Sequence, residues 1–168
     1  MKIRLGRKND ERKILELYTQ GKNWFRKFGI DQWLDGYPNE ESFLEDIKEK
    51  HLYLWEDDEV MATGVLMTKQ EPTYKNIYKG KWHFPEPYGT IHRFTVANKW
   101  KGQGLGLQCF KDLEEIGKEK GCKSIRIDTH EDNKCMKRLI EKAGYMYAGI
   151  IYLEDGAKRL AYEKSLEE

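Results

Sequence analysis

Apolar residues in the first half of the chain alternate between strand-like and helix-like spacing. Ile3 to Leu5 predicts a short strand, and Asn9 or Asp10 then caps a helix that ends at Gly21. The apolar face of that helix consists of Ile14, Leu15, Leu17 and Tyr18. Residues 22–37 are aromatic and irregular, and Asn39 caps a second helix with Phe43, Leu44 and Ile47 on one face. The chain therefore opens with one strand and two helices.

The middle of the chain predicts a hairpin and then a long loop. Leu52 to Trp55 and Val60 to Thr68 are strand-like runs separated by the acidic turn Glu56 to Glu59, which indicates two antiparallel strands. Glu71 to Pro87 contains three prolines among aromatic residues, a composition typical of a shaped loop. This loop interrupts the pattern without ending the domain.

The second half of the chain predicts a βαβ unit followed by a helix and a strand pair. Tyr88 to Val96 and Ser124 to Asp128 are strands on either side of a helix from Gly104 to Lys120, which favours parallel pairing. Asp132 or Asn133 caps a further helix ending near Gly144, and two closing strands follow, at Tyr145 to Leu153 and Arg159 to Tyr162. The whole pattern predicts the α/β class.

Length, charge and cysteine content narrow the setting of this fold. A chain of 168 residues fits one domain, so residues 1–168 are expected to form a single unit. Lys and Arg total 30 against 29 for Asp and Glu, which gives no reason to expect nucleic acid or an anionic membrane as partner. Three widely spaced cysteines and the lack of an apolar leader or membrane span fit a soluble protein of the reducing cytoplasm.

The segment most informative about function is Lys101-Gly102-Gln103-Gly104-Leu105-Gly106, between a strand and a helix. A helix N-terminus presents unpaired N–H groups and partial positive charge, and glycines let a pyrophosphate approach that backbone. A tight turn also needs glycine for steric reasons alone, and that explanation stays open. The loop lacks the Gly-Lys-Ser/Thr of a nucleotide P-loop and the glycine spacing of a dinucleotide-binding fingerprint.

Here the sequence resembles the GNAT family of N-acetyltransferases. Residues 101–106 are similar to the family pattern Gln/Arg-x-x-Gly-x-Gly/Ala, with lysine in the first position. The resemblance continues in Arg93-Phe94-Thr95-Val96 and in Asp128-Thr129-His130 with Asn133. It implies one domain with a mixed central sheet of about six to seven strands, flanked by helices, whose central parallel strands splay apart.

The resemblance also implies which residues hold acetyl-CoA. The pantetheine arm would lie along the backbone of Phe94, Thr95 and Val96, and the pyrophosphate would lie on Lys101, Gly102, Gln103, Gly104, Leu105 and Gly106. A backbone N–H at the break in the strand would stabilise the oxyanion that forms as an amine attacks. Asn133 would contact the cofactor through its side chain, although a role as helix N-cap is the alternative.

The catalytic groups are less well defined by the sequence. Many family members carry a tyrosine seven residues beyond the asparagine, where this chain has Ile140. Tyr145 and Tyr147 are the candidates to protonate the leaving thiolate instead, and packing at the start of a strand is their alternative role. His92 is the candidate general base because imidazole titrates near neutral pH. Deprotonation through water is the alternative, and His130 beside Asp128 either forms an oriented pair or stabilises a loop. Trp24, Trp33 and Tyr37 are the candidate substrate-binding residues.

The predicted activity is N-acetyl transfer from acetyl-CoA to the primary amine of a small molecule or peptide by direct attack. A catalytically weak acyl-CoA sensor is the first alternative, and a nucleotide- or phosphate-binding domain is the second. No metal is expected, because the histidines lack the spacing of a metal motif. Family resemblance makes a monomer or a homodimer the natural expectation.

Overall fold

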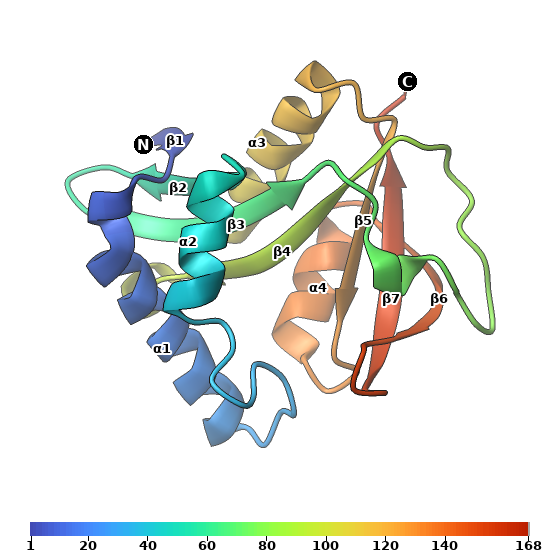
Figure 1. The fold of residues 1–168 in the computed structure, drawn as a ribbon, viewed down its shortest axis with the longest axis horizontal. Coiled ribbons are helices and arrows are strands. Elements are labelled where there is room, and N and C mark those ends of the chain that lie inside the picture. Colours follow the sequence, from blue (N-terminus) through green and yellow to red (C-terminus); the bar gives the residue numbers. More distant parts are fainter. Residues whose placement is uncertain (168) are drawn as a thin grey trace. The chain divides into compact units, whose positions relative to one another are not determined.

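The computed structural model describes residues 1–167, which form a seven-stranded mixed sheet and four α-helices. The strands are β1 (Lys2–Leu5), β2 (Leu52–Glu56), β3 (Val60–Met67), β4 (Tyr88–Val96), β5 (Ser124–Thr129), β6 (Met146–Tyr152) and β7 (Lys158–Ser165). The helices are α1 (Glu11–Lys27), α2 (Glu40–Lys48), α3 (Leu105–Glu119) and α4 (Lys134–Lys142). The strand order is β1-β2-β3-β4-β5-β7-β6 (Figure 1). The predicted α/β class and strand number are confirmed.

The chain divides into two compact units. The first contains residues 1–66 and 92–109, and the second contains residues 67–91 and the described residues from 110 onward. Strand β4 and helix α3 each contribute residues to both units. No helix in the described range is long and apolar enough to cross a membrane.

The strand pairing agrees with the predicted hairpins and with the predicted βαβ unit. In the first unit, β1, β2 and β3 pair antiparallel. In the second, β5 and β6 each pair antiparallel with β7. The parallel pairing of β4 with β5 joins Tyr88–Thr90 to Ser124–Arg126. Because the strands that precede and follow α3 in the chain pair in parallel, the predicted βαβ unit is confirmed.

Beyond its parallel segment, β4 has an irregular backbone. Arg93 has a φ of 48°, in the left-handed region that a non-glycine residue in a strand rarely adopts. A left-handed residue interrupts the side-chain alternation of a strand and re-aims the residues beside it. This irregularity is of the kind that the family resemblance implies for the strand before the glycine loop.

Most predicted helix ends are confirmed by their caps. The Asn39 side chain accepts a hydrogen bond from Ser42 N at the start of α2, and the Asn133 side chain accepts one from Met136 N at the start of α4. Gly121 and Gly144, just beyond α3 and α4, have φ angles of 87° and 91°, as expected for glycines that end helices.

The predicted end of the first helix at Gly21 is wrong, because α1 continues to Lys27. Gly21 is buried, and a Cβ atom added there would lie 2.6 Å from Cζ3 of Trp33. The glycine therefore allows an aromatic ring to approach the helix closely and does not terminate it. Residues 22–27, the first six of the segment predicted to be irregular, are helical, so the irregular segment begins only after residue 27.

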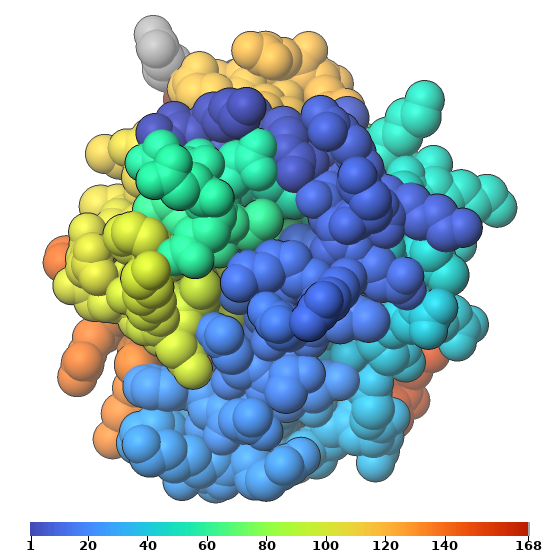
Figure 2. All heavy atoms as spheres, turned by 90° about the vertical axis from the view of Figure 1, so that its left-hand side faces the viewer, coloured from blue at the N-terminus to red at the C-terminus, as the bar shows by residue number. Residues whose placement is uncertain are grey.

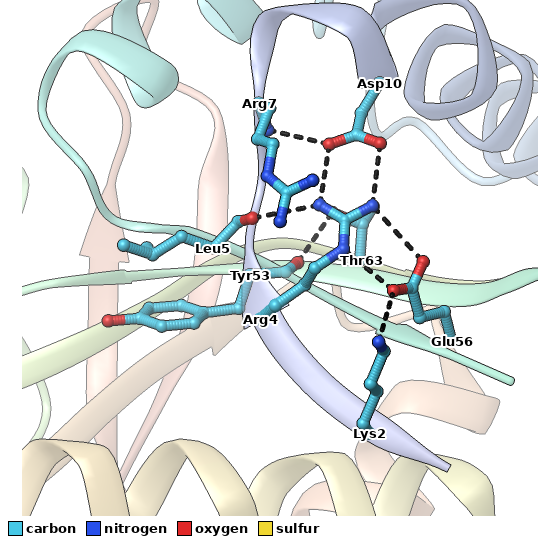
Figure 3. A network of polar contacts seen from close by, with 8 residues as sticks. All are labelled: Lys2, Arg4, Leu5, Arg7, Asp10, Tyr53, Glu56 and Thr63. Atoms are coloured by element: carbon cyan, nitrogen blue, oxygen red, sulfur yellow. Dashed lines mark hydrogen bonds and ion pairs between the residues drawn. The ribbon is translucent and has the colours of Figure 1, made fainter.

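A polar network joins β1, β2 and the start of α1 (Figure 3). The Arg4 guanidinium donates to both oxygens of Asp10, each at 2.9 Å, and to both oxygens of Glu56, at 2.9 and 3.2 Å. Asp10 also accepts from Arg7 N at 2.7 Å. Asp10 thus stands at the N-terminus of α1, as predicted, but its carboxylate binds Arg4 and Arg7 and not the first turn of the helix. Hydrogen bonding from Arg4 lowers the pKa of that carboxyl group.

We predict that Gly21→Ala destabilises the protein by about 1 to 3 kcal/mol, because the added methyl group overpacks against the Trp33 ring. In an unobstructed helix interior the same change stabilises by roughly 0.5 to 1 kcal/mol. Urea unfolding of both proteins measures the difference. Asn23→Ala, at an exposed position of the same helix, is the control and should be neutral or slightly stabilising. A stabilised Gly21→Ala protein would show that the ring moves aside freely.

Candidate functional site

The loop between β4 and α3 has the backbone geometry of an anion-binding helix start. A 3-10 turn, Asn98–Trp100, leads into Lys101, and α3 begins at Leu105. Gly102 and Gly104 have φ angles of 76° and 79°, which L-residues rarely adopt, and a Cβ atom added to either would meet nothing within 4 Å. The glycines are therefore required by the backbone conformation, and they leave open space in front of the first turn of α3.

Contacts to α1 and to the β2–β3 turn hold this loop in place. Asn98 N donates to Oε1 of Gln20 at 2.8 Å, and Lys99 Nζ donates to Oε1 of Glu59 at 2.8 Å. Figure 2 shows the corresponding surface, where the yellow-green loop lies beside the blue helix and the green hairpin. The loop is thus fixed by groups outside itself, as a pre-formed binding site requires.

Lys101, the only formal charge in the hexapeptide, lies over an aromatic ring. Its Nζ atom is 4.3 Å from the ring centroid of Trp24 on α1, within cation–π range. The structure therefore brings a predicted substrate residue, Trp24, to a predicted cofactor residue. The ring restrains the ammonium group beside the open glycine backbone.

The residues of this loop fit a pyrophosphate group. The first N–H groups of a helix have no partner within it, and they carry the positive end of the helix dipole. Two side-chain-free positions and one lysine complete a donor set suited to a diphosphate. In such a site the amides of residues 104–106 and the Lys101 ammonium would hold the phosphates.

The three predicted cofactor residues of β4 follow its left-handed residue directly. Phe94 and Thr95 are buried, Val96 is partly exposed, and the Phe94 ring packs edge-on against Trp55 at a centroid distance of 6.2 Å. His92 precedes the irregular position and is partly exposed. Because Arg93 interrupts the strand geometry, period-two alternation does not place His92 and Phe94 on one face.

Arg93 anchors a buried charge network that the sequence reasoning missed. Its Nε and Nη2 atoms donate to the two oxygens of Asp46 at 2.7 and 2.6 Å, and its Nη1 donates to the Tyr37 hydroxyl at 2.6 Å. His51 Nε2 lies 2.8 Å from Asp46 Oδ1. Burial alone would raise the pKa of the Asp46 carboxyl group, but hydrogen bonds from His51 and Arg93 hold it below its ordinary value. The sequence signal that could have indicated a buried Asp46 was its position three residues after Phe43, because residues three apart in a helix lie on the same face.

Strained backbone marks the segment between α1 and α2, and an unsatisfied hydroxyl lies on the face of α1 against which its Trp33 packs. Trp33 and Asp35 have φ angles of 57° and 58°, and such outliers concentrate at functional sites. The Trp33 ring packs edge-on against Tyr18 and Phe25, at centroid distances of 5.9 and 5.4 Å. The Tyr18 hydroxyl is buried and has no hydrogen-bond partner among the described residues. Burial, together with the charge of Asp46, raises its pKa, so this hydroxyl keeps its proton.

Of the two candidate acids, one is committed to a structural contact. Tyr145 is buried, and its hydroxyl donates to Oε2 of Glu114 at 3.0 Å, while Oε1 of Glu114 accepts from Lys164 at 2.7 Å. Burial and the negative charge of Glu114 raise the pKa of Tyr145 well above its ordinary value. Tyr147 is 47 % exposed and stacks edge-on against Tyr162. Only Tyr147 therefore presents an accessible hydroxyl.

The predicted groups at the end of β5 and in the loop after it have structural partners. The Asn133 side chain caps α4, the role expected from the sequence as the alternative to a cofactor contact. His130 Nδ1 accepts from Asp132 N at 3.0 Å, whereas Asp128 accepts from the Tyr74 hydroxyl at 2.6 Å. His130 thus stabilises the loop into α4. Within residues 1–167 no three His, Cys, Asp or Glu side chains are grouped so as to hold a metal ion.

Comparisons with known proteins agree with this geometry. A family model described as the acetyltransferase (GNAT) family matches residues 18–145. An acetyltransferase of the GNAT family from Streptococcus agalactiae is 34 % identical, with 99 % of this chain and 96 % of that one covered at a TM-score of 0.91. The uncharacterized N-acetyltransferase YesJ of Bacillus subtilis is 22 % identical over 143 residues, which cover 83 % of this chain and 78 % of YesJ.

A more distant solved structure includes a ligand. It is yncA, a putative acetyltransferase from Salmonella typhimurium, with its cofactor acetyl-CoA. It is 16 % identical, and the comparison covers 100 % of this chain and 95 % of that one at a TM-score of 0.69. At this identity the likeness concerns the fold.

We predict that Asp46→Asn destabilises the protein by about 3 kcal/mol or more near neutral pH, because it leaves the buried Arg93 charge uncompensated. The pKa of Asp46 is depressed in the folded state, so its contribution is present above its unfolded value of about 3.9 and is lost as pH falls through the folded value. Urea unfolding near neutral pH and below about pH 3 should show the variant's deficit shrinking in acid.

Asp58→Asn is the matched control for this change. Asp58 is exposed in the β2–β3 turn, and its removal should change the free energy of unfolding by less than about 0.5 kcal/mol. A deficit of Asp46→Asn that is the same at both pH values would contradict the assignment of charge to this carboxylate.

Proposed function

Because the chain belongs to the GNAT acetyltransferase family, we propose that it transfers the acetyl group of acetyl-CoA to a primary amine by direct attack. The observation that carries this proposal is the open start of α3, where Gly102 and Gly104 adopt left-handed conformations beside Lys101. Acetyl-CoA in a distant relative of the same fold supports the choice of co-substrate. The amine is proposed to belong to a small molecule or a peptide.

In the proposed reaction the amine nitrogen attacks the thioester carbonyl carbon. A nitrogen–carbon bond forms, the carbon–sulfur bond breaks, and the amine loses one proton while the departing thiolate gains one. The role proposed for β4 is to offer backbone groups of Phe94, Thr95 and Val96 to the pantetheine arm, and an N–H group to the developing oxyanion. The parallel register of β4 with β5 covers Tyr88–Thr90, and the left-handed Arg93 interrupts the strand geometry beyond it, which supports this role.

His92 and Tyr147 are the groups that we propose for proton transfer. His92 lies next to the irregular position of β4 and is partly exposed, so an amine can reach it. Tyr147 is preferred to Tyr145 as proton donor because its hydroxyl is exposed, whereas the Tyr145 proton is donated to Glu114.

We propose that the segment between α1 and α2 binds the acceptor amine. Trp33 and Tyr37 supply aromatic surface, and the unpartnered Tyr18 hydroxyl is a hydrogen-bonding group that a polar acceptor would satisfy. Trp24 is proposed to act on the cofactor side, through its contact with Lys101. Asn133 remains a proposed cofactor contact in addition to its capping role.

A catalytically weak acyl-CoA sensor is the second candidate. It is favoured by Ile140, which occupies the position where many relatives carry a tyrosine. Ile140 is fully buried and has no proton to donate to the leaving thiolate. Tight binding of acetyl-CoA without turnover of any amine in a broad panel would support the sensor. Release of free thiol that depends on an amine would support the enzyme. We further propose that residues 1–168 act as one domain, in the cytoplasm, as a monomer or homodimer.

We predict that Gly104→Glu abolishes acetyl-CoA binding in calorimetric titration. The substitution puts a side chain and a negative charge where the pyrophosphate is proposed to lie. Gly121→Glu is the matched control, since Gly121 also has a positive φ, also has open space around it, and lies just beyond the other end of α3. It should cost similar stability yet bind acetyl-CoA as the unmodified protein does. Equal affinity in both variants would disprove the proposed phosphate site.

We predict that His92→Ala lowers kcat about 100-fold or more if the imidazole is the base. The pH dependence of the activity should also change, because the proposed proton acceptor has been removed. Amine-dependent release of coenzyme A across a pH series measures both effects. His130→Ala is the control histidine, because its ring accepts from a loop amide, and its pH profile should be unchanged. Full activity of His92→Ala would leave water as the base.

A further inference from the structure

The second compact unit contains a cavity lined by a buried arginine. It has a volume of about 470 Å³, within the range typical of small-molecule sites. Its walls come from the segment 70–88 and from β5, and they include Tyr74, Trp82, Tyr88 and Arg126. Tyr74 and Tyr88 are buried, Trp82 is partly buried, and the remaining lining residues are mostly exposed at the rim.

Arg126 is 6 % exposed and lacks the partners that a buried arginine normally has. Its Nη2 makes one long hydrogen bond to the carbonyl oxygen of Phe84, at 3.4 Å, and the guanidinium also hydrogen-bonds to the Tyr88 side chain. Its buried Nε has no partner in the described part of the chain. Buried arginines are usually satisfied by a carboxylate that accepts two parallel hydrogen bonds. Here burial lowers the pKa of the guanidinium, and the contacts with Tyr88 and the charges of Glu86 and Glu163 offset this effect only in part.

The carboxylates near Arg126 are engaged elsewhere. Glu163 lies opposite Arg126 on β7 and is fully buried, but its two oxygens accept from His83 N, His83 Nδ1 and Phe84 N. Glu86 is exposed at the rim and accepts from Gln70 Nε2 at 3.3 Å. Both act on Arg126 only as charges at a distance.

Aromatic rings hold the guanidinium in a fixed plane. Its Cζ atom lies 4.0 Å from the ring centroid of Tyr88 and 4.5 Å from that of Trp82. The Trp82 ring is itself held by a hydrogen bond from Nε1 to the carbonyl oxygen of Tyr74, at 2.9 Å. A planar cation held by rings leaves its edge for hydrogen bonding, which suits a planar anion.

We propose that this cavity binds a small organic carboxylate, with Arg126 as the group that recognises it. The other charged residues that line the cavity are Lys75, Glu71 and Glu86. Together with Arg126 they give the lining a formal net charge of zero, and this disfavours a dianion such as a phosphate monoester. One carboxylate on the buried guanidinium gives the arginine its missing partner, and the aromatic walls accept an apolar body. The proposal goes beyond acetyl transfer and does not rest on it.

The test uses benzoate and its neutral isostere benzamide with the full chain. Binding is followed by NMR through the Nε–H resonance of Arg126 and the Nε1–H resonance of Trp82, assigned with Arg126→Met and Trp82→Phe. Benzoate should shift both resonances in a saturable way and benzamide should not. Acetate and phenylacetate extend the series, and phenyl phosphate tests the dianion. No saturable shift with any of the three carboxylates, or tighter binding of phenyl phosphate, would overturn the proposal.

Two substitutions separate ligand binding from a purely structural role of Arg126. Arg126→Met should weaken benzoate binding at least about tenfold, the loss expected for a charge-assisted hydrogen bond, measured through the Trp82 resonance. Its midpoint of thermal unfolding should stay the same or rise, because an uncompensated buried charge has been removed. A lower midpoint with unchanged benzoate affinity would assign Arg126 to the fold alone.

Glu86→Gln gives a second measure at an exposed position where folding is not at risk. Removing a negative charge from the rim should strengthen benzoate binding about twofold to fivefold at low salt and less at high salt. Unchanged affinity at both salt concentrations would place benzoate outside this cavity. Gly104→Glu, which is expected to lose acetyl-CoA, should bind benzoate normally, so failure of one proposal is distinguishable from failure of the other.

Discussion

The ion pair between Asp46 and Arg93 is the interaction on which the first compact unit depends. It joins the last turn of α2 to the one residue of β4 with a left-handed backbone, and both side chains lie largely out of water. A non-glycine residue in that conformation persists only when its surroundings fix it. Here two short hydrogen bonds to one carboxylate, and a third to Tyr37, supply that constraint. The irregular strand that leads to the glycine loop is thus maintained by charge pairing from a neighbouring helix.

Arg93 and Arg126, whose side chains are both largely removed from water, differ in a way that separates structure from recognition. Arg93 has a carboxylate that satisfies two of its nitrogens, and a hydroxyl that satisfies the third. Arg126 has aromatic rings on its faces, one long contact to a carbonyl oxygen and a hydrogen bond to the Tyr88 side chain, but no hydrogen bond to a carboxylate among the described residues. A buried charge without a close partner is costly unless something outside the chain compensates it. That difference is the physical reason for assigning a ligand to the second arginine and a structural role to the first.

Glycine serves two unrelated purposes in this chain, and only the tertiary contacts distinguish them. Gly102 and Gly104 have positive φ angles and open space around them, so they are needed for backbone conformation and for access by a ligand. Gly21 is helical and buried under Trp33, so it is needed because no side chain fits. In the amino-acid sequence both kinds of glycine follow an apolar helix or strand pattern, so the sequence alone does not tell the two purposes apart.

The sequence by itself determined the order of helices and strands, most helix caps, the parallel βαβ unit and the glycine loop. These features depend on local periodicity and on backbone preferences of nearby residues, which a linear pattern records. The tertiary structure alone decided that α1 continues through Gly21, that Lys101 lies on Trp24, and that Tyr145 is committed to Glu114. It also decided that Arg93, and not Arg126, hydrogen-bonds to a carboxylate. Such outcomes depend on groups that are from about ten to about eighty residues apart in the chain, and which of them meet is fixed only when the strands and helices pack.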